Sequence, residues 1–260
     1  MKLPIYQVDA FTGKLFGGNP AAICPLDLWL PDETMQSIAA ENNLAETAFY
    51  IRKNGGFHIR WFTPGVEVDL CGHATLAAAH VIMELRREAR HGRVVFDSKS
   101  GELIVTRESD LYALDFPSRP PVETAIDERL FDALGATPTH ALAARDYFCV
   151  FETEADVRAL HPNMERLAAI PQFATIVTAP GDECDFVSRF FAPAQGVPED
   201  PVTGSAHCTL IPYWAERLAK SKLHARQISA RGGELWCEHR GDRVSIAGKA
   251  VSYLEGTIAV

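Results

Sequence analysis

Two stretches of this sequence decide the fold: "DLCGHATLAAAH", Asp69–His80, and "EDPVTGSAH", Glu199–His207. Each passes from an acidic residue through a glycine into a run of apolar residues at helical spacing. The first run is apolar nearly all round from Ala74 to Leu85, which is typical of a helix that is surrounded by protein. The two stretches therefore predict two central helices, each of which begins at a glycine.

The residues before each helix repeat as well. "RWFTP" at Arg60–Pro64 precedes the first helix, and "RFFAP" at Arg189–Pro193 precedes the second. Fourteen residues before those arginines lie Glu46 and Thr175, each inside a run that reads as a strand. The order strand, strand, helix thus occurs twice, and the second connecting loop is longer by three residues. This internal repeat predicts two similar domains that face each other across a cleft.

The 260 residues are enough for two medium-sized domains. "SRPPVETAIDE", Ser118–Glu128, concentrates proline and polar residues and marks the predicted boundary. The expected domains are 1–118 and 119–260, with the last strand free to return to the first domain. We expect the central helices over residues 72–87 and 203–220.

Proline inside the second of these helices predicts a kink or a break there, because Pro212 lacks the N–H that the helix needs.

Composition excludes several function classes. The 25 basic and 34 acidic residues give a net charge of −9, which opposes binding to nucleic acid. No stretch of about 18 apolar residues is present, and the first residues lack the features of a signal peptide, so we expect a cytoplasmic protein with no membrane partner. The 6 cysteines show no C-x-x-C pair and no regular spacing, which argues against a metal site and against a disulfide framework.

The two helix starts are candidate anion sites. The first N–H groups of a helix have no partner within the helix, and the helix dipole places partial positive charge there. Gly72 and Gly204 let a ligand approach the backbone closely, while His73 and Ser205 add side-chain donors at matching positions. Thr203 precedes the second glycine. We therefore expect a small carboxylic acid as the ligand.

Glu46 is the candidate general base. It lies within "LAETAFY", where one acid interrupts a largely apolar strand. A carboxylate at the exposed beginning of a strand is the alternative reading. The repeat favours a cleft position, where loss of hydration suits the carboxylate to general-base catalysis.

Four further residues each have a functional and a structural interpretation. Asp200 either lines the cleft or caps the second helix, and His73 either contacts the ligand or packs in the core. Cys71 stands at a helix start, which lowers the pKa of a thiol, but the matching position in the second half is Thr203. Asn19 in "GGNPA" lies either in a loop that lines the cleft or in an ordinary turn.

Taken together, four motifs resemble the phenazine-biosynthesis PhzF-like family, which is related in fold to diaminopimelate epimerase. The motifs are "FGGNPAA", "NLAETAF", "DLCGHATLAAAH" and "EDPVTGSAH". The resemblance implies an α+β fold of two pseudo-symmetric domains, each a curled, mostly antiparallel and barrel-like sheet around a central helix. It also implies an active site between the domains and a homodimer.

The same resemblance implies roles for individual residues. Glu46 matches the acid/base of the family, and His73, Asp200 and Ser205 match residues that line its site. The founding member of the family isomerises a hydroxylated cyclohexadiene carboxylate without a cofactor.

We therefore expect a cofactor-independent isomerase of a small carboxylic acid, in which Glu46 removes a proton and delivers it to another carbon. One alternative is a two-base epimerase or racemase that uses Cys71. The other is a non-catalytic protein that binds a small acid.

Overall fold

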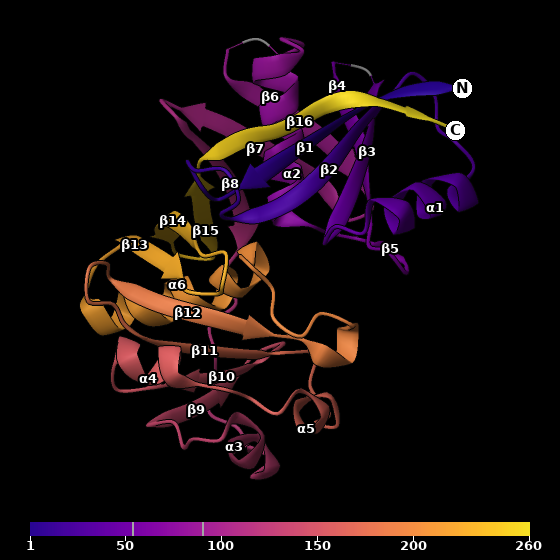
Figure 1. The fold of residues 1–260 in the computed structure, drawn as a ribbon. Coiled ribbons are helices and arrows are strands. Elements are labelled where there is room, and N and C mark those ends of the chain that lie inside the picture. The colour runs from indigo at the N-terminus through magenta and orange to yellow at the C-terminus, as the bar shows by residue number, and fades with distance from the viewer. Residues whose placement is uncertain (54, 90) are drawn as a thin grey trace. The chain divides into compact units, whose positions relative to one another are not determined.

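The structure is a computed structural model, and it describes residues 1–53, 55–89 and 91–260. It divides into two compact units, which are described separately below (Figure 1). Unit 1 comprises Met1–Asp115 and Ala247–Val260, and unit 2 comprises Phe116–Ile246. The chain thus leaves unit 1 three residues before the expected boundary at residue 118, and its last strand belongs to unit 1.

Unit 1 is a curled sheet with a helix inside it. Its strands are β1 (Lys2–Ala10), β2 (Asn19–Leu26), β3 (Glu46–Lys53), β4 (Gly56–Phe62), β5 (Glu67–Val68), β6 (Arg93–Ser98), β7 (Gly101–Glu108), β8 (Leu111–Pro117) and β16 (Ala250–Ala259). Its helices are α1 (Asp32–Asn42), α2 (Gly72–His80) and the π-helical segment η1 (Val81–Leu85). The strand order is β16–β1–β2–β3–β4–β6–β7–β8, and β5 pairs with β4.

Unit 2 is built from a second set of strands and helices. Its strands are β9 (His140–Ala143), β10 (Tyr147–Val150), β11 (Thr175–Pro180), β12 (Phe186–Phe191), β13 (Lys222–Gln227), β14 (Gly233–Arg240) and β15 (Arg243–Gly248). Its helices are α3 (Arg129–Leu134), α4 (Glu154–Ala159), α5 (Met164–Ala168), the short η2 (Pro193–Gln195) and α6 (Gly204–Leu218). The strands follow one another in the sheet in sequence order.

The internal repeat extends further than the sequence indicated. The pairs β1/β2, β3/β4 and β6/β7 are antiparallel, whereas β2/β3 and β4/β6 are parallel. Unit 2 shows the same alternation, because β9/β10, β11/β12 and β13/β14 are antiparallel and β10/β11 and β12/β13 are parallel. The equivalents of β1 and β2 in the second half, β9 and β10, complete the repeating unit.

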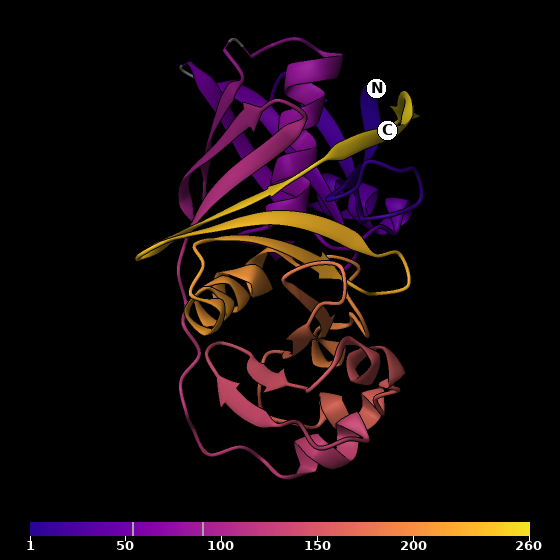
Figure 2. The same cartoon turned by 90° about the vertical axis from the view of Figure 1, so that its left-hand side faces the viewer.

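Helix α2 is the core of unit 1. It contacts β1, β2, β3, β7 and β16, and every residue from His73 to His80 is buried. Figure 2 shows this purple helix running between strands of its own unit. The prediction of a helix surrounded by protein is confirmed, although the α-helix ends at His80 and continues as η1 to Leu85 rather than to residue 87. No helix among the described residues is long and apolar enough to span a membrane.

Helix α6 runs through Pro212 without interruption, so of the expected kink or break the break is wrong. Proline removes the hydrogen bond that its N–H would donate to the carbonyl four residues earlier. That carbonyl belongs to Cys208, and it accepts a hydrogen bond from the N–H of Arg119 at 2.8 Å instead. The helix therefore continues because a segment from outside it supplies the missing donor.

The strand register corrects one correspondence between the halves. Arg60 on β4 pairs with Phe49, whereas Arg189 on β12 pairs with Val177. The connection between β11 and β12 is therefore one residue longer than the connection between β3 and β4. With the arginines aligned, Thr175 corresponds to Thr47 rather than to Glu46, so Glu46 has no side-chain counterpart with hydrogen-bonding atoms at that position.

The same arginines form matching ion pairs. Arg60 donates from Nε and Nη2 to the two carboxylate oxygens of Glu67 at 2.7 and 3.0 Å. Arg189 donates to Glu199 with the same geometry and the same two distances. The partners are 7 residues apart in unit 1 and 10 in unit 2, which absorbs the longer second loop. Each pair thus anchors the loop that leads into α2 or α6.

We predict that Glu67→Gln lowers the free energy of unfolding by about 1.5–3 kcal/mol near neutral pH, because Arg60 loses a charged acceptor. Hydrogen bonding to Arg60 is the main cause that lowers the pKa of Glu67 to about 2, with burial opposing it and Lys99 assisting. A lowered folded-state pKa stabilises the protein above the unfolded-state value, so the effect of the substitution shrinks as the pH falls toward about 2. Urea unfolding at several pH values measures it.

The matched control is Glu41→Gln, which changes an exposed glutamate of α1 and should leave stability unchanged. Equal stability of the Glu67→Gln and Glu41→Gln variants would show that the ion pair does not anchor the loop.

Candidate active site

Three elements of unit 1 begin at the same place. β2 and β3 run parallel, with Ala21 beside Glu46, so both strands start at the same edge of the sheet. Helix α2 starts there with Gly72, and His73 is its second residue. Asn19 is the first residue of β2 and not part of a loop, because Gly18 with its φ of 60° completes the turn before it. The fold thus brings Asn19, Glu46 and His73 together.

His73 connects the other two side chains. Its Nε2 lies 3.0 Å from Oε2 of Glu46, and its Nδ1 lies 3.2 Å from Nδ2 of Asn19. The side chain of His73 is 7% exposed and that of Glu46 is 19% exposed. The carboxylate is therefore the member of the pair that a substrate can reach, while the buried imidazole contacts it from the protein interior.

The surroundings of His73 favour its charged form. Burial lowers the pKa of His73, but the neighbouring Cys71 and Glu46 outweigh burial and raise that pKa well above its ordinary value. The carboxylate of Glu46 thus favours the protonated imidazole, and in that form the contact is an ion pair. A charged pair of this kind, fixed at a helix start, can pass a proton to a substrate and take one from it.

Cys71 precedes α2 as its N-cap residue, and its Sγ lies 3.5 Å from Nδ1 of His73. Burial, together with the charge of Glu46, raises the pKa of this thiol to about 11. The expected lowering by the helix start is wrong, because loss of hydration outweighs the helix dipole and the nearby imidazole. The thiol therefore keeps its proton at neutral pH.

The predicted residues of unit 2 form a second cluster at the start of α6. The hydroxyl of Thr203 donates to Asp200. Gln227, which is buried at the end of β13, accepts from the N–H of Thr203 at 2.9 Å and donates to the Asp200 carbonyl at 2.8 Å. Gly204 is the first residue of the helix that Thr203 precedes. This network fixes the helix start with neutral groups and one carboxylate.

Two members of the second cluster were missed by the sequence reasoning. Gln227 follows the alternation of Leu223 and Ala225 onto the buried face of β13, and a polar residue in such a series is a signal. Arg145 donates from Nη2 to Oγ of Ser205 at 3.3 Å and forms a two-pronged ion pair with Asp146 at 2.9 Å. The sequence signal for Arg145 is weaker, since Arg145 and Asp146 are only a pair of opposite charges before the apolar strand β10.

The second turn of each helix carries the same structural hydrogen bond. Thr75 Oγ1 donates to the Cys71 carbonyl at 2.5 Å, and His207 Nδ1 donates to the Thr203 carbonyl at 2.8 Å. Burial lowers the pKa of His207 to about 4, so its ring is neutral. His207 therefore stabilises the start of α6 as a neutral ring. The surroundings of His73, in contrast, favour its charged form.

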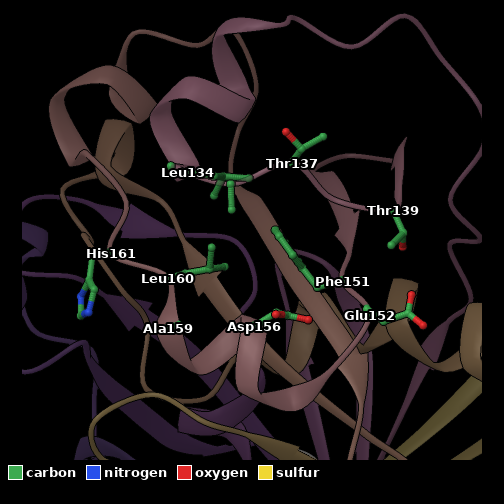
Figure 3. A pocket seen from close by; sticks show the side chains of 11 residues that line it. Leu134, Thr137, Thr139, Phe151, Glu152, Asp156, Ala159, Leu160 and His161 are labelled. Carbon is green, nitrogen blue, oxygen red and sulfur yellow. The ribbon is translucent and has the colours of Figure 1, made fainter.

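A cavity lies elsewhere in unit 2, between α3, α4 and the strands β9 and β10 (Figure 3). Its volume is about 560 Å³, and Leu134, Phe151 and Leu160 line it together with the carboxylates of Glu152 and Asp156. It contains none of the predicted site residues. Carboxylates without a lining lysine or arginine repel a carboxylic acid, so this cavity does not fit the expected ligand.

The chain is similar to known proteins over nearly its whole length. A family model described as phenazine biosynthesis-like protein matches residues 8–256. An uncharacterized isomerase of Pseudomonas aeruginosa is 56% identical over 259 residues, which is 99% of each chain. A crystal structure of a phenazine biosynthesis protein of the PhzF family from Enterococcus faecalis covers 100% of both chains at 45% identity and a TM-score of 0.96.

More distant structures support the fold class alone. A predicted epimerase from Pseudomonas aeruginosa is 17% identical and has a TM-score of 0.78 over 99% of each chain. The expected α+β fold of the diaminopimelate epimerase type is thereby confirmed.

We predict that Glu46→Gln lowers the pKa of His73, because the substitution removes a negative charge 3.0 Å from its ring while burial continues to oppose protonation. Histidine ring signals followed by NMR as a function of pH measure this. His224, whose ring contacts Glu234 at 2.8 Å, is the internal control, and its ring signals should be the same in the variant and the native protein. A His73 titration that does not respond to the substitution would contradict the ion pair.

Proposed function

The chain belongs to the phenazine biosynthesis-like protein family and is an isomerase, and we propose that it moves a proton within a small carboxylic acid through Glu46. One observation carries the proposal: the carboxylate of Glu46 is partly exposed and lies 3.0 Å from the buried imidazole of His73. This arrangement gives a base that a substrate can reach and an acid that stabilises the base.

The proposed reaction has two proton transfers and no net change in composition. Glu46 takes a proton from a carbon next to an activating group, and the electron pair of the broken C–H bond spreads into the conjugated system of the substrate. The resulting carboxylic acid of Glu46, which is partly exposed and exchanges its proton with solvent, then gives a proton to another carbon. No oxidant and no leaving group are needed, and general acid–base catalysis of this kind contributes about 10²–10⁴-fold to the rate.

The helix starts supply the binding energy in this proposal. We propose that N–H groups at the start of α2, beginning with Gly72, bind the carboxylate of the substrate or the negative charge that develops on it. Each such donor contributes about 2.7–4 kcal/mol to stabilisation of a transition-state charge. In unit 1, the side chains of His73 and Asn19 also contribute to binding of the substrate. At the start of α6, we assign Asp200 and Ser205 to catalysis, in which they hold the substrate and shuttle or stabilise charge, and Thr203 and Gly204 to substrate binding.

We also infer that the enzyme acts without a cofactor, as a homodimer, and in the cytoplasm. The first two inferences rest on the family resemblance. The third is supported by the cysteines, all of which are free, since free thiols are typical of reducing compartments.

A two-base epimerase is the second candidate, because Cys71 Sγ lies only 3.5 Å from His73. Such an enzyme needs a second base on the opposite face of the substrate. Burial keeps the thiol protonated at neutral pH, whereas the mechanism requires a thiolate as the base, and the matching residue in unit 2 is Thr203. The single carboxylate is therefore favoured.

The test of the first candidate is incorporation of solvent deuterium into a panel of amino acids and of cyclic or aromatic-precursor carboxylates. We predict that Glu46→Gln lowers the incorporation rate by about 10²–10⁴-fold, because the amide cannot accept the proton. Mass spectrometry of the recovered acid measures it.

Glu41→Gln, which carries the same chemical change on an exposed face of α1, is the control and should keep full activity. Full activity of Glu46→Gln would end the assignment of Glu46. Saturable binding of an acid without any deuterium uptake would support a non-catalytic binding protein.

Cys71→Ser separates the two candidates. The single-carboxylate mechanism predicts that this variant keeps its deuterium incorporation within about tenfold of the native rate, since the proton does not pass through the thiol. A loss as large as that of Glu46→Gln, together with inactivation of the native enzyme by a thiol reagent, would favour the epimerase.

A further inference from the structure

Glu46, Cys71 and His73 carry three different kinds of metal ligand. One carboxylate oxygen, one sulfur and one ring nitrogen of these residues all lie within 4.8 Å of one another. Among residues 1–53, 55–89 and 91–260, this is the one group of three such side chains that is close enough to share an ion. The proton-transfer mechanism uses the carboxylate and the imidazole but not the sulfur.

Two of the three separations between these atoms are close to those of a tetrahedral zinc site. Zinc bonds of about 2.3 Å to sulfur and about 2.0–2.1 Å to nitrogen and oxygen place neighbouring ligand atoms about 3.4–3.6 Å apart. Nε2 of His73 lies 3.0 Å from Oε2 of Glu46 and 4.0 Å from Sγ of Cys71. Moving each atom by roughly half an ångström or less brings both separations to those of a zinc site.

The elements that carry the ligands hold them in place. Cys71 and His73 flank Gly72 at the first turn of α2, and Glu46 starts β3, so the backbone is fixed by a helix and a sheet. Cys71 and His73 are buried, while Glu46 is the partly exposed member and gives an ion access from solvent. Three protein ligands leave the fourth tetrahedral position to water or to an anion.

We propose that Glu46, Cys71 and His73 bind one zinc ion. On binding, the thiol of Cys71 and the imidazolium of His73 each release a proton to solvent, and lone pairs of sulfur, nitrogen and oxygen occupy three positions on the ion. Thiolate and carboxylate together neutralise the two positive charges of zinc, which a buried site requires.

The ion and the proposed proton transfer exclude each other. Zinc on Glu46 and His73 removes the base and its partner from the reaction, so the metal acts as an inhibitor rather than as a cofactor. The inference concerns binding alone, and it holds whether or not Glu46 proves to be the catalytic base.

The experiment titrates zinc chloride into the full-length protein, freed of metal with a chelator, in competition with a chromophoric chelator and without substrate. We expect one equivalent of zinc per chain. Cys71→Ser and Glu46→Gln should each weaken binding at least about 100-fold, because loss of a ligand costs no less than loss of an outer contact, about 10–100-fold. His224→Ala, which breaks a histidine–glutamate contact that has no cysteine, should bind zinc as the native protein does.

The absorption spectrum of the native protein with cobalt chloride is a second measurement, and it does not depend on whether a variant folds. Cobalt in this site should show the thiolate-to-metal charge-transfer band in the near ultraviolet together with the visible bands of a four-coordinate ion. Absence of the thiolate band in the native protein, absence of zinc binding, or equal zinc affinity in all three variants would each overturn the proposal. Loss of zinc binding in Cys71→Ser with deuterium uptake retained would support it and leave the proposed function intact.

Discussion

The contact between Glu46 and His73 is the interaction on which the account depends. It exists because a parallel strand pair and a buried helix begin at the same edge of unit 1, so that a strand-borne carboxylate meets a histidine in the first helical turn. The imidazole is held in the protein and the carboxylate remains accessible. A helix start adds N–H donors that have no partner within the helix backbone. Glu46, His73 and the first N–H groups of α2 are thus brought together by backbone geometry.

The repeat gives two helix starts with one geometry and different chemistry. In unit 1 the residues around the first glycine are Cys71 and His73, whose side chains are titratable, whereas in unit 2 they are the hydroxyl residues Thr203 and Ser205. Gln227 and Asp200 hold Thr203 in place, and Arg145 reaches Ser205. A duplicated unit can keep its backbone because matching ion pairs, Arg60–Glu67 and Arg189–Glu199, anchor the loop before each helix. The functional difference between the halves then requires only a few side-chain changes.

The features that the sequence predicted were those set by local pattern. The apolar run after Gly72 predicted a buried helix, and the repeated "RWFTP" and "RFFAP" located the strands before each helix start. Features that depend on pairing were not predictable in this way. The register that separates Glu46 from Thr175 is set by a connection one residue longer, and the donor that keeps α6 intact at Pro212 is the distant Arg119. Cysteine spacing likewise gave no indication of the Glu46–Cys71–His73 group, because its carboxylate comes from another element.

Where a small carboxylate binds is the most direct test of the central claim. Acetate titrated into the nitrogen-15-labelled protein reports this through its amide signals. The account predicts saturable shifts at the amides of Gly72, His73 and Ala74, where α2 begins beside Glu46. Shifts confined to the cavity around Leu134, Phe151 and Leu160, with none at the start of α2, would contradict it.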